Sequence, residues 1–224
     1  MSVLLEGVRK SYRGRPVLAI DRLQIPAGAQ WVITGTSGSG KTTLLNLIAG
    51  ILAPDAGRVT VAGVDLTALS EAARDRLRAE RIGIVFQTFN LLQGFSALEN
   101  VLLGMLFAGK PDRARAEALL ERVGLKEQVR ATPSELSVGQ QQRVAIARAL
   151  ANKPGLILAD EPTGNLDPAT GESIVDLLKA VCAEGGETLV IVTHQPAVMK
   201  SFKDLYDLTC LSGPSSSGAS PSAA

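Results

Sequence analysis

The chain has 224 residues, enough for one large domain or two small ones, and 46% of them are apolar, which supports a sizeable core. Its 23 lysines and arginines nearly balance 22 aspartates and glutamates, and only 4% of the residues are aromatic. This composition indicates a globular protein and disfavours nucleic acid as the main partner, because it offers neither a strong basic excess nor many stacking platforms.

Cysteines and apolar runs indicate where the protein works. Cys182 and Cys210 form neither a disulfide framework nor a C-x-x-C metal pattern, so a reducing, cytosolic setting fits best. The apolar stretches are far shorter than the ~20 residues of a membrane-spanning helix, and residues 1–10 lack the pattern of a secretory signal. We therefore expect a chain that neither crosses a membrane by itself nor is exported.

Short apolar runs between turn residues predict a strand-rich first part of the chain. The expected strands are 3–8, 17–25, 30–34 and 58–61, several of them antiparallel. A helix over 41–48 follows the third of these strands through a glycine loop.

The pattern changes after about residue 90, and a helical subdomain is expected over 90–150. After this subdomain, strands and helices alternate along the chain again, which predicts a parallel sheet covered on both faces. The expected elements in this part are helices over 112–123, 141–151 and 171–184 and strands over 156–159 and 188–193.

The last residues differ from all others in composition. Residues 212–224 are almost entirely Ser, Gly, Pro and Ala, which bury too little apolar area to offset the entropy lost on ordering. We expect one domain over 1–211 and a disordered tail over 212–224.

Residues 35–42 form the strongest local motif. They fit G-x-x-x-x-G-K-[ST] and lie between a predicted strand and a predicted helix, as a phosphate-binding loop requires. Glycines let backbone N–H groups surround an anion, while Lys41 adds a positive charge and the Thr42 hydroxyl can ligate Mg²⁺. The alternative is a glycine-rich turn without a ligand. The predicted nucleotide-contacting residues are Gly35, Thr36, Ser37, Gly38, Ser39, Gly40, Lys41, Thr42 and Thr43.

Two carboxylates follow an apolar strand. Asp160 and Glu161 come directly after residues 156–159, at the strand end where open α/β sheets bind ligands. Asp160 is expected to hold Mg²⁺, directly or through water, and Glu161 to polarise an attacking water. Alone, the pattern fits a strand stopped by solvated charges equally well, but beside a phosphate loop the magnesium interpretation is favoured.

Ser137 and Gln140 have the spacing of a capping box. The helix behind them should therefore begin there, with free N–H groups and a positive dipole end, which makes a second potential anion site. Four residues alone more often mark an ordinary capped helix.

Taken in order, these motifs resemble the ATPase subunits of ATP-binding cassette (ABC) transporters. Residues 136–140 resemble the LSGGQ signature, 156–161 the Walker B motif and 165–167 the D-loop. The resemblance covers nearly the whole chain, from Tyr12 to His194.

The resemblance also implies roles for three further side chains. Tyr12 would stack on adenine, Gln87 would contact Mg²⁺ or the attacking water, and His194 would contact the γ-phosphate as the switch histidine. From the residues alone, each has a plainer alternative: an aromatic near a strand end often packs into a core, a lone histidine is often structural, and a glutamine often lies in a plain loop. Trp31 is expected in the core.

Residues 86–92, 98–101 and 162–167 resemble the branch of the family that serves lipoprotein release, macrolide export and related tasks. That branch couples ATP to motion of a membrane partner. Two positions depart from the family. Val138 replaces the first glycine of the signature, and Gln195 follows His194 where the family often has Asp, so the fold beyond about residue 201 is not predicted.

The resemblance implies an α/β fold, in which a P-loop ATPase core carries an antiparallel β subdomain and an inserted helical subdomain. It implies Mg²⁺-dependent hydrolysis of ATP that drives a membrane-embedded permease, by a peripheral subunit on the cytoplasmic face of the inner membrane. It also implies a dimer, most simply a homodimer, in which Ser137, Gly139 and Gln140 of one subunit face the phosphate loop of the other.

Two other classes are weaker. A soluble ABC ATPase that acts on nucleic acid is the alternative, but such chains usually carry two cassettes or a long coiled coil, and this one has neither. A P-loop kinase or GTPase gives no reason for Ser137 or for residues 165–167.

Overall fold

Antiparallel pairing joins the first strands of the chain into one sheet. In the computed structural model, which describes residues 1–109 and 111–208, β1 (Val3–Tyr12) pairs with β2 (Arg15–Ile25) and with β4 (Ala56–Val61). The short β5 (Val64–Asp65) pairs with β4. Cys210 and the tail expected over 212–224 lie outside the described residues.

The second sheet is parallel throughout, as strand and helix alternation predicts. Its order is β6-β7-β8-β3-β9. The strands are β6 (Ile82–Val85), β7 (Leu156–Asp160), β8 (Thr188–Val192), β3 (Gln30–Thr34) and β9 (Asp204–Asp207).

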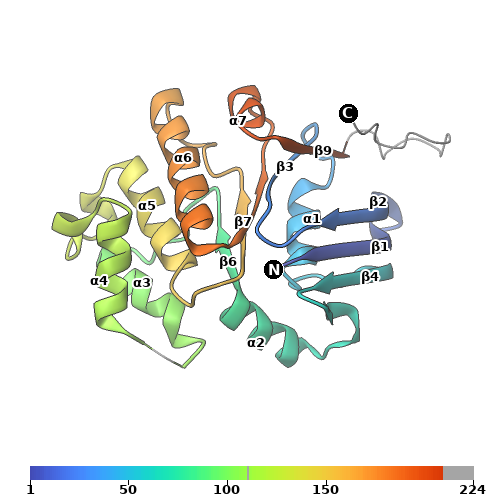
Figure 1. The fold of residues 1–224 in the computed structure, drawn as a ribbon, viewed down its shortest axis with the longest axis horizontal. Coiled ribbons are helices and arrows are strands. Elements are labelled where there is room, and N and C mark those ends of the chain that lie inside the picture. Colours follow the sequence, from blue (N-terminus) through green and yellow to red (C-terminus); the bar gives the residue numbers. More distant parts are fainter. Residues whose placement is uncertain (110, 209–224) are drawn as a thin grey trace.

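Helices lie on both sides of this sheet (Figure 1). The α-helices are α1 (Lys41–Ile48), α2 (Glu71–Arg81), α3 (Ala97–Leu106), α4 (Arg113–Arg122), α5 (Val138–Ala149), α6 (Pro168–Gly185) and α7 (Pro196–Lys200). Short 3-10 turns occupy Leu66–Ala68, Lys126–Gln128 and Pro133–Glu135.

The parallel strands bury both of their faces, because successive side chains point to opposite sides of the sheet. In β7, Leu156 and Leu158 join a core with α1 and the antiparallel sheet, whereas Ile157 and Ala159 join a core with α3, α5 and α6. Trp31 is partly buried against the first of these cores. The sheet is therefore the middle layer, with its two sides built from different parts of the chain.

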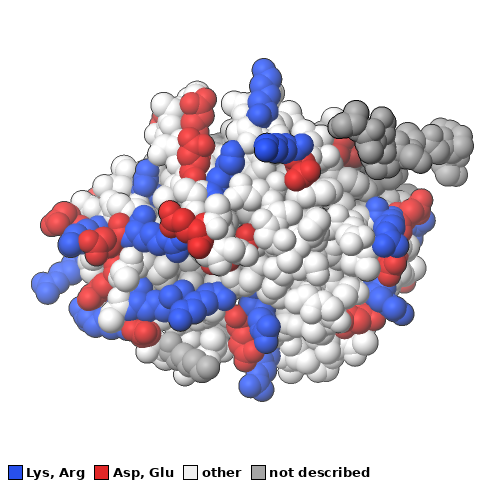
Figure 2. All heavy atoms as spheres, in the orientation of Figure 1, with Lys and Arg blue, Asp and Glu red and all other residues white. Residues whose placement is uncertain are grey.

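Helices α3, α4 and α5 contact one another and lie within the range 90–150 in which the sequence predicts a helical subdomain. In Figure 1 they stand on one side of the parallel sheet, and β1, β2 and β4 stand on the other. Figure 2 shows side chains of both charge signs interleaved over the side of the molecule where α4 lies, so this face carries no single-sign field.

Three boundaries differ by three residues or more from the predicted ranges, each for a local reason. Helix α5 begins at Val138, where the capping box at Ser137 predicts its start, and not at 141, where the predicted helical range begins. Helix α6 begins at Pro168 rather than 171, because Asp167 accepts a hydrogen bond from the Thr170 N–H and proline suits the first helical position. The strand predicted over 3–8 continues to Tyr12, where it turns into β2.

Candidate active site

The loop between β3 and α1 lines a cavity. Gly38 and Gly40 have φ values of 80° and 93°, in the left-handed region that favours glycine. A Cβ atom at Gly40 would lie 2.9 Å from the Val17 carbonyl oxygen, so no larger residue fits without a shift. Helix α1 has no side-chain cap, which leaves its first N–H groups available to an anion.

Lys41 lies inside this loop with only 8% of its surface exposed. Its Nζ donates hydrogen bonds to the carbonyl oxygens of Gly35, at 2.8 Å, and Thr36, at 2.9 Å. The ammonium is thus held at the floor of the loop beside the cavity, where it can add a positive charge to the backbone N–H groups.

Asp160 ends β7 on the opposite wall of the cavity. Burial raises the pKa of its carboxyl, and a hydrogen bond from Thr42 and the charge of Lys41 oppose that rise, whereas Glu161 adds to it. A partly buried carboxylate next to a hydroxyl is a hard oxygen donor set of the kind that Mg²⁺ prefers. The described residues contain no cluster of three or more His, Cys, Asp or Glu side chains fit for a metal.

Glu161 follows directly and has both carboxylate oxygens engaged. Its Oε1 lies 2.7 Å from Nδ1 of His194, and its Oε2 accepts a hydrogen bond from the Thr193 hydroxyl at 3.1 Å. The backbone of Glu161 has a φ of 46°, an uncommon value for a residue with a side chain. Only 12% of the Glu161 side chain is exposed, against 64% for His194.

Gln87 follows β6 and reaches the same cavity. The Asn165 amide donates to the Gln87 carbonyl oxygen at 2.9 Å, so the D-loop holds the backbone of the segment that carries Gln87. A Cβ atom at Gly164 would lie 2.7 Å from the Gln87 Nε2, which shows how closely the two segments pack.

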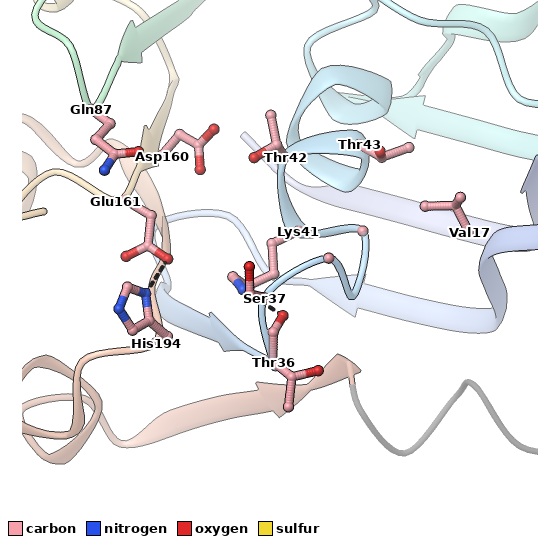
Figure 3. A pocket seen from close by; sticks show the side chains of 12 residues that line it. Val17, Thr36, Ser37, Lys41, Thr42, Thr43, Gln87, Asp160, Glu161 and His194 are labelled. Carbon is pink, nitrogen blue, oxygen red and sulfur yellow. Dashed lines mark hydrogen bonds and ion pairs between the residues drawn. The ribbon is translucent and has the colours of Figure 1, made fainter. Parts of the chain in front are cut away.

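These residues surround one cavity of about 720 Å³. Figure 3 shows the loop residues on one wall, facing Gln87, Asp160, Glu161 and His194 on the other. Of the residues predicted from sequence, the cavity is lined by Thr36, Ser37, Gly38, Gly40, Lys41, Thr42, Thr43, Gln87, Asp160, Glu161 and His194.

Val17 also lines the cavity, and sequence reasoning missed it. It lies near the start of β2, and its carbonyl contacts the loop at Gly40. A valine in a strand carries no chemical signal, so only its place opposite the loop identifies it.

Tyr12, Gly35 and Ser39 do not line the cavity. Tyr12 lies at the end of β1, opposite Arg15 in the hairpin, and is 44% exposed, so the core alternative for this residue is wrong. Within the loop, Gly35 and Ser39 pack closely against each other, since a Cβ atom at Gly35 would meet the buried Ser39 Oγ at 2.4 Å.

The signature residues lie at the start of α5, and they do not line this cavity either. Ser137 Oγ accepts from the Gln140 N–H at 3.2 Å, and Gln140 Oε1 accepts from the Ser137 N–H at 2.9 Å. The predicted capping box is therefore present. Gly139 faces α6, because a Cβ atom there would lie 2.8 Å from Thr170 Cγ2, and Val138 is 46% exposed.

No helix among residues 1–109 and 111–208 has the length and apolar character needed to cross a membrane.

Known proteins are similar to this chain over most of its length. A family model described as "ABC transporter" matches residues 18–164. The "Lipoprotein-releasing system ATP-binding protein LolD" of Pseudomonas fluorescens is 48% identical over 83% of this chain and 85% of that protein. The "Macrolide export ATP-binding/permease protein MacB" of Syntrophobacter fumaroxidans is 46% identical over 87% of this chain, which spans only 28% of that protein.

The fold matches solved structures as well. One is described as "Dimeric structure of a post-hydrolysis state of the ATP-binding cassette MJ0796 bound to ADP and Pi", and another as "Dimeric Structure of MJ0796, a Bacterial ABC Transporter Cassette". Each has a TM-score of 0.84 and 40% sequence identity, and each match covers 92% of this chain and 94% of the other.

Proposed function

This chain belongs to the ABC transporter family, and from that premise we propose that it is the ATP-binding and ATP-hydrolysing subunit of a transporter. The observation that carries the proposal is a single cavity in which a phosphate loop with a buried lysine faces two carboxylates, a glutamine and a histidine. Each of these groups has a part in phosphoryl transfer to water.

The loop residues bind the nucleotide. N–H groups of the glycine loop and of the first turn of α1 contact the phosphates, and the Lys41 ammonium exchanges the carbonyl oxygens of Gly35 and Thr36 for phosphate oxygens. Tyr12 stacks on the adenine from the exposed end of β1, where it is accessible to a ligand.

Thr42, Asp160 and Gln87 hold the Mg²⁺ ion, which neutralises charge on the phosphates when it is bound. Partial burial raises the pKa of the Asp160 carboxyl, against the hydrogen bond from Thr42 and the charge of Lys41. A divalent cation bound there would favour the charged carboxylate.

Glu161 acts as the general base on the attacking water, because it lies on the cavity wall next to the magnesium ligand Asp160. His194 has its second ring nitrogen free to reach toward the γ-phosphate, while Nδ1 contacts Glu161. Catalysis then depends on two side chains from the ends of adjacent parallel strands, β7 and β8.

Signature residues complete the site from a second subunit. Ser137, Gly139 and Gln140 lie outside the cavity of their own chain, and the N-terminus of α5 leaves N–H groups free to meet an anion. Donors on several sides of the transferred phosphoryl group stabilise the charge that develops there. A homodimer with two shared sites satisfies this geometry, and the similar cassette structures are described as dimeric.

Helix α3 is the contact for the membrane permease. Phe95, Leu102, Leu103 and Leu106 line an apolar groove of about 230 Å³ along this helix. The groove is joined to the segment behind Gln87 through Asn100, whose side chain bonds both the N–H and the carbonyl of Leu92. An apolar segment of the permease seated there is therefore connected to the catalytic cavity.

The task of the transporter is of the lipoprotein-releasing or macrolide-exporting kind, in which ATP-driven dimer closure moves the permease. The subunit lies on the cytoplasmic face of the membrane, bound to that permease. The similarity to LolD extends over most of both chains, which supports an ATPase of this branch.

Exchange of Glu161 for glutamine tests the proposal. Glu161→Gln removes the base but leaves the phosphate loop intact, so ATP should bind with unchanged affinity while turnover falls at least about a hundredfold. Glu172→Gln, on the exposed side of α6, is the matched control and should turn over like wild type. Turnover of Glu161→Gln within a few-fold of wild type would remove Glu161 from its role.

A further inference from the structure

Two loops meet beside Glu161 through a pair of side chains. The Thr163 hydroxyl, in the loop behind β7, donates to Gln195 Oε1 at 2.8 Å. The Gln195 Nε2, in the loop behind β8, donates back to the Thr163 carbonyl oxygen at 3.3 Å. Thr163 is only 1% exposed and Gln195 is half-buried, so these contacts are shielded from water on the Thr163 side. We call this two-point contact between Thr163 and Gln195 the loop clip.

The loop clip continues to the catalytic carboxylate. The Gln195 backbone N–H donates to the Thr193 hydroxyl at 3.1 Å, and that hydroxyl donates to Glu161 Oε2. Thr193 is fully buried, so it has no water to exchange with. One chain of hydrogen bonds thus runs from Thr163 through Gln195 and Thr193 to Glu161.

The Thr163 end of the clip is fixed by helices. The Gln142 side chain of α5 donates to the Pro162 carbonyl at 2.9 Å, and a Cβ atom at Gly171 of α6 would lie 3.3 Å from Thr163 Cβ. Gln195 is the residue before α7, yet its side chain makes no cap for that helix and turns to Thr163 instead. The loop clip therefore connects the loop behind β8 to a segment that packs against α5 and α6.

Glu161 needs such a support because its backbone is in the left-handed region, with a φ of 46°. A residue with a side chain holds this conformation only where its surroundings over-determine it. Hydrogen bonds from the Glu161 N–H to the Val192 carbonyl and from the Gly164 N–H to the Glu161 carbonyl contribute to this, and the loop clip closes the other side.

We infer that Thr163 and Gln195 are positioning residues for hydrolysis, which hold the Glu161 carboxylate in the place from which it can act on water. The inference rests on the proposed role of Glu161 as the base. Neither Thr163 nor Gln195 lines the nucleotide cavity, so the clip should affect the rate of the chemical step and not the affinity for ATP.

A double-mutant cycle in the full chain tests the inference. Gln195→Met and Thr163→Val keep the volume of each side chain but remove its hydrogen bonds. Each variant should lower kcat by a factor of about 3 to 10, with KM and the dissociation constant for ATP unchanged. The double variant should be no slower than Gln195→Met, because Gln195→Met already removes both contacts of the loop clip, whereas Thr163→Val removes only the one made by its hydroxyl.

A matched control and a conservative variant separate positioning from folding. Gln30→Met makes the same exchange where Gln30 donates to the Lys179 carbonyl at 2.9 Å, away from the cavity, and should keep wild-type kcat. Thr163→Ser keeps the hydroxyl and should recover most of the kcat lost in Thr163→Val. Rates are normalised to the fraction of protein that binds ATP, so unfolded protein does not count.

Two results would overturn the inference: a kcat within twofold of wild type for Gln195→Met, or single losses that multiply in the double variant, which would mean that the two side chains act independently. A wild-type protein without ATPase activity, or a Glu161→Gln variant with wild-type turnover, would instead refute the proposed function itself.

Discussion

Arg148 shows how one side chain connects the signature helix to the loop that carries Gln87. From α5, its Nη1 donates to the Asn90 carbonyl at 2.5 Å and its Nη2 to the Phe89 carbonyl at 2.6 Å. Both Phe89 and Asn90 have positive φ values, 53° and 50°. Burial lowers the pKa of the Arg148 guanidinium, because the charged group is partly removed from water.

Substitution of Arg148 should therefore lower the free energy of unfolding, and a side chain without the forked guanidinium should not replace it fully. Arg148→Met leaves two carbonyl oxygens without their charged donor and should lower the free energy of unfolding by about 2 to 4 kcal/mol. Arg148→Lys, with a single ammonium, should recover only part of this loss. Urea denaturation measures both, and a lysine variant as stable as wild type would contradict the account.

At the scale of residues, sequence identifies the groups whose chemistry is unusual for their context. Lys41 stands out as a cation that follows a glycine-rich loop, and Asp160 and Glu161 stand out because they follow an apolar strand in a chain that also contains such a loop. Val17 does not stand out, because a valine in a strand is common, and Gln195 stands out only as a departure from the family, with no sign of its contact with Thr163. Their importance depends on contacts between segments far apart in the chain.

Helix α3 illustrates the element scale. Ser96 and Glu99 form a reciprocal capping box at its start, and the Ser96 hydroxyl and N–H lower the pKa of the Glu99 carboxyl. A carboxyl whose pKa is lower in the folded than in the unfolded protein adds stability above its unfolded value, and this stability is lost as the pH falls through the folded pKa. The start of α3 should therefore weaken in acid.

Glu99→Gln tests this dependence, because glutamine keeps a hydrogen-bonding oxygen but not the charge. Wild type should be more stable than Glu99→Gln at pH 7, and the difference should shrink as the pH falls below the usual value of 4.5. Urea denaturation of both proteins between pH 3.5 and 7 gives this difference. A gap that stays constant over the range would show that the charge on Glu99 has no part in the cap.

A strong apolar pattern makes an element predictable only in part, since α5 and α6 are expected from the sequence whereas α3 and β6 are not. Helix α2 has no buried residue and only one large apolar side chain, Leu77, so no continuous apolar stripe marks it, although Ser70 caps it. The strand β9 contains only four residues and is defined by its pairing with β3, not by its own composition. The sequence therefore indicates the central sheet and its glycine loop, while the edges of the fold depend on tertiary contacts.

At the scale of the whole molecule, the proposed active site depends on a second subunit. The cavity of one chain holds the phosphate loop and the carboxylates, while the start of α5 lies outside it. Sequence suggests this division only through family resemblance, because no spacing within one chain indicates that two motifs meet across an interface. The central claim is that each active site is completed by the signature residues of the partner.

Mixing two inactive variants tests this claim most directly. Ser137→Arg places bulk and charge at the start of α5, and Lys41→Ala removes the phosphate-binding cation, so each homodimer has two broken sites. In a mixed dimer, one site has both defects and the other has neither.

The measurement is the ATPase rate of the mixture, with the permease present and with mixed dimers confirmed by crosslinking. The account predicts that mixing restores hydrolysis well above the sum of the two separate proteins. Activity that stays at background in confirmed mixed dimers, or full activity of the Ser137→Arg homodimer alone, would contradict it.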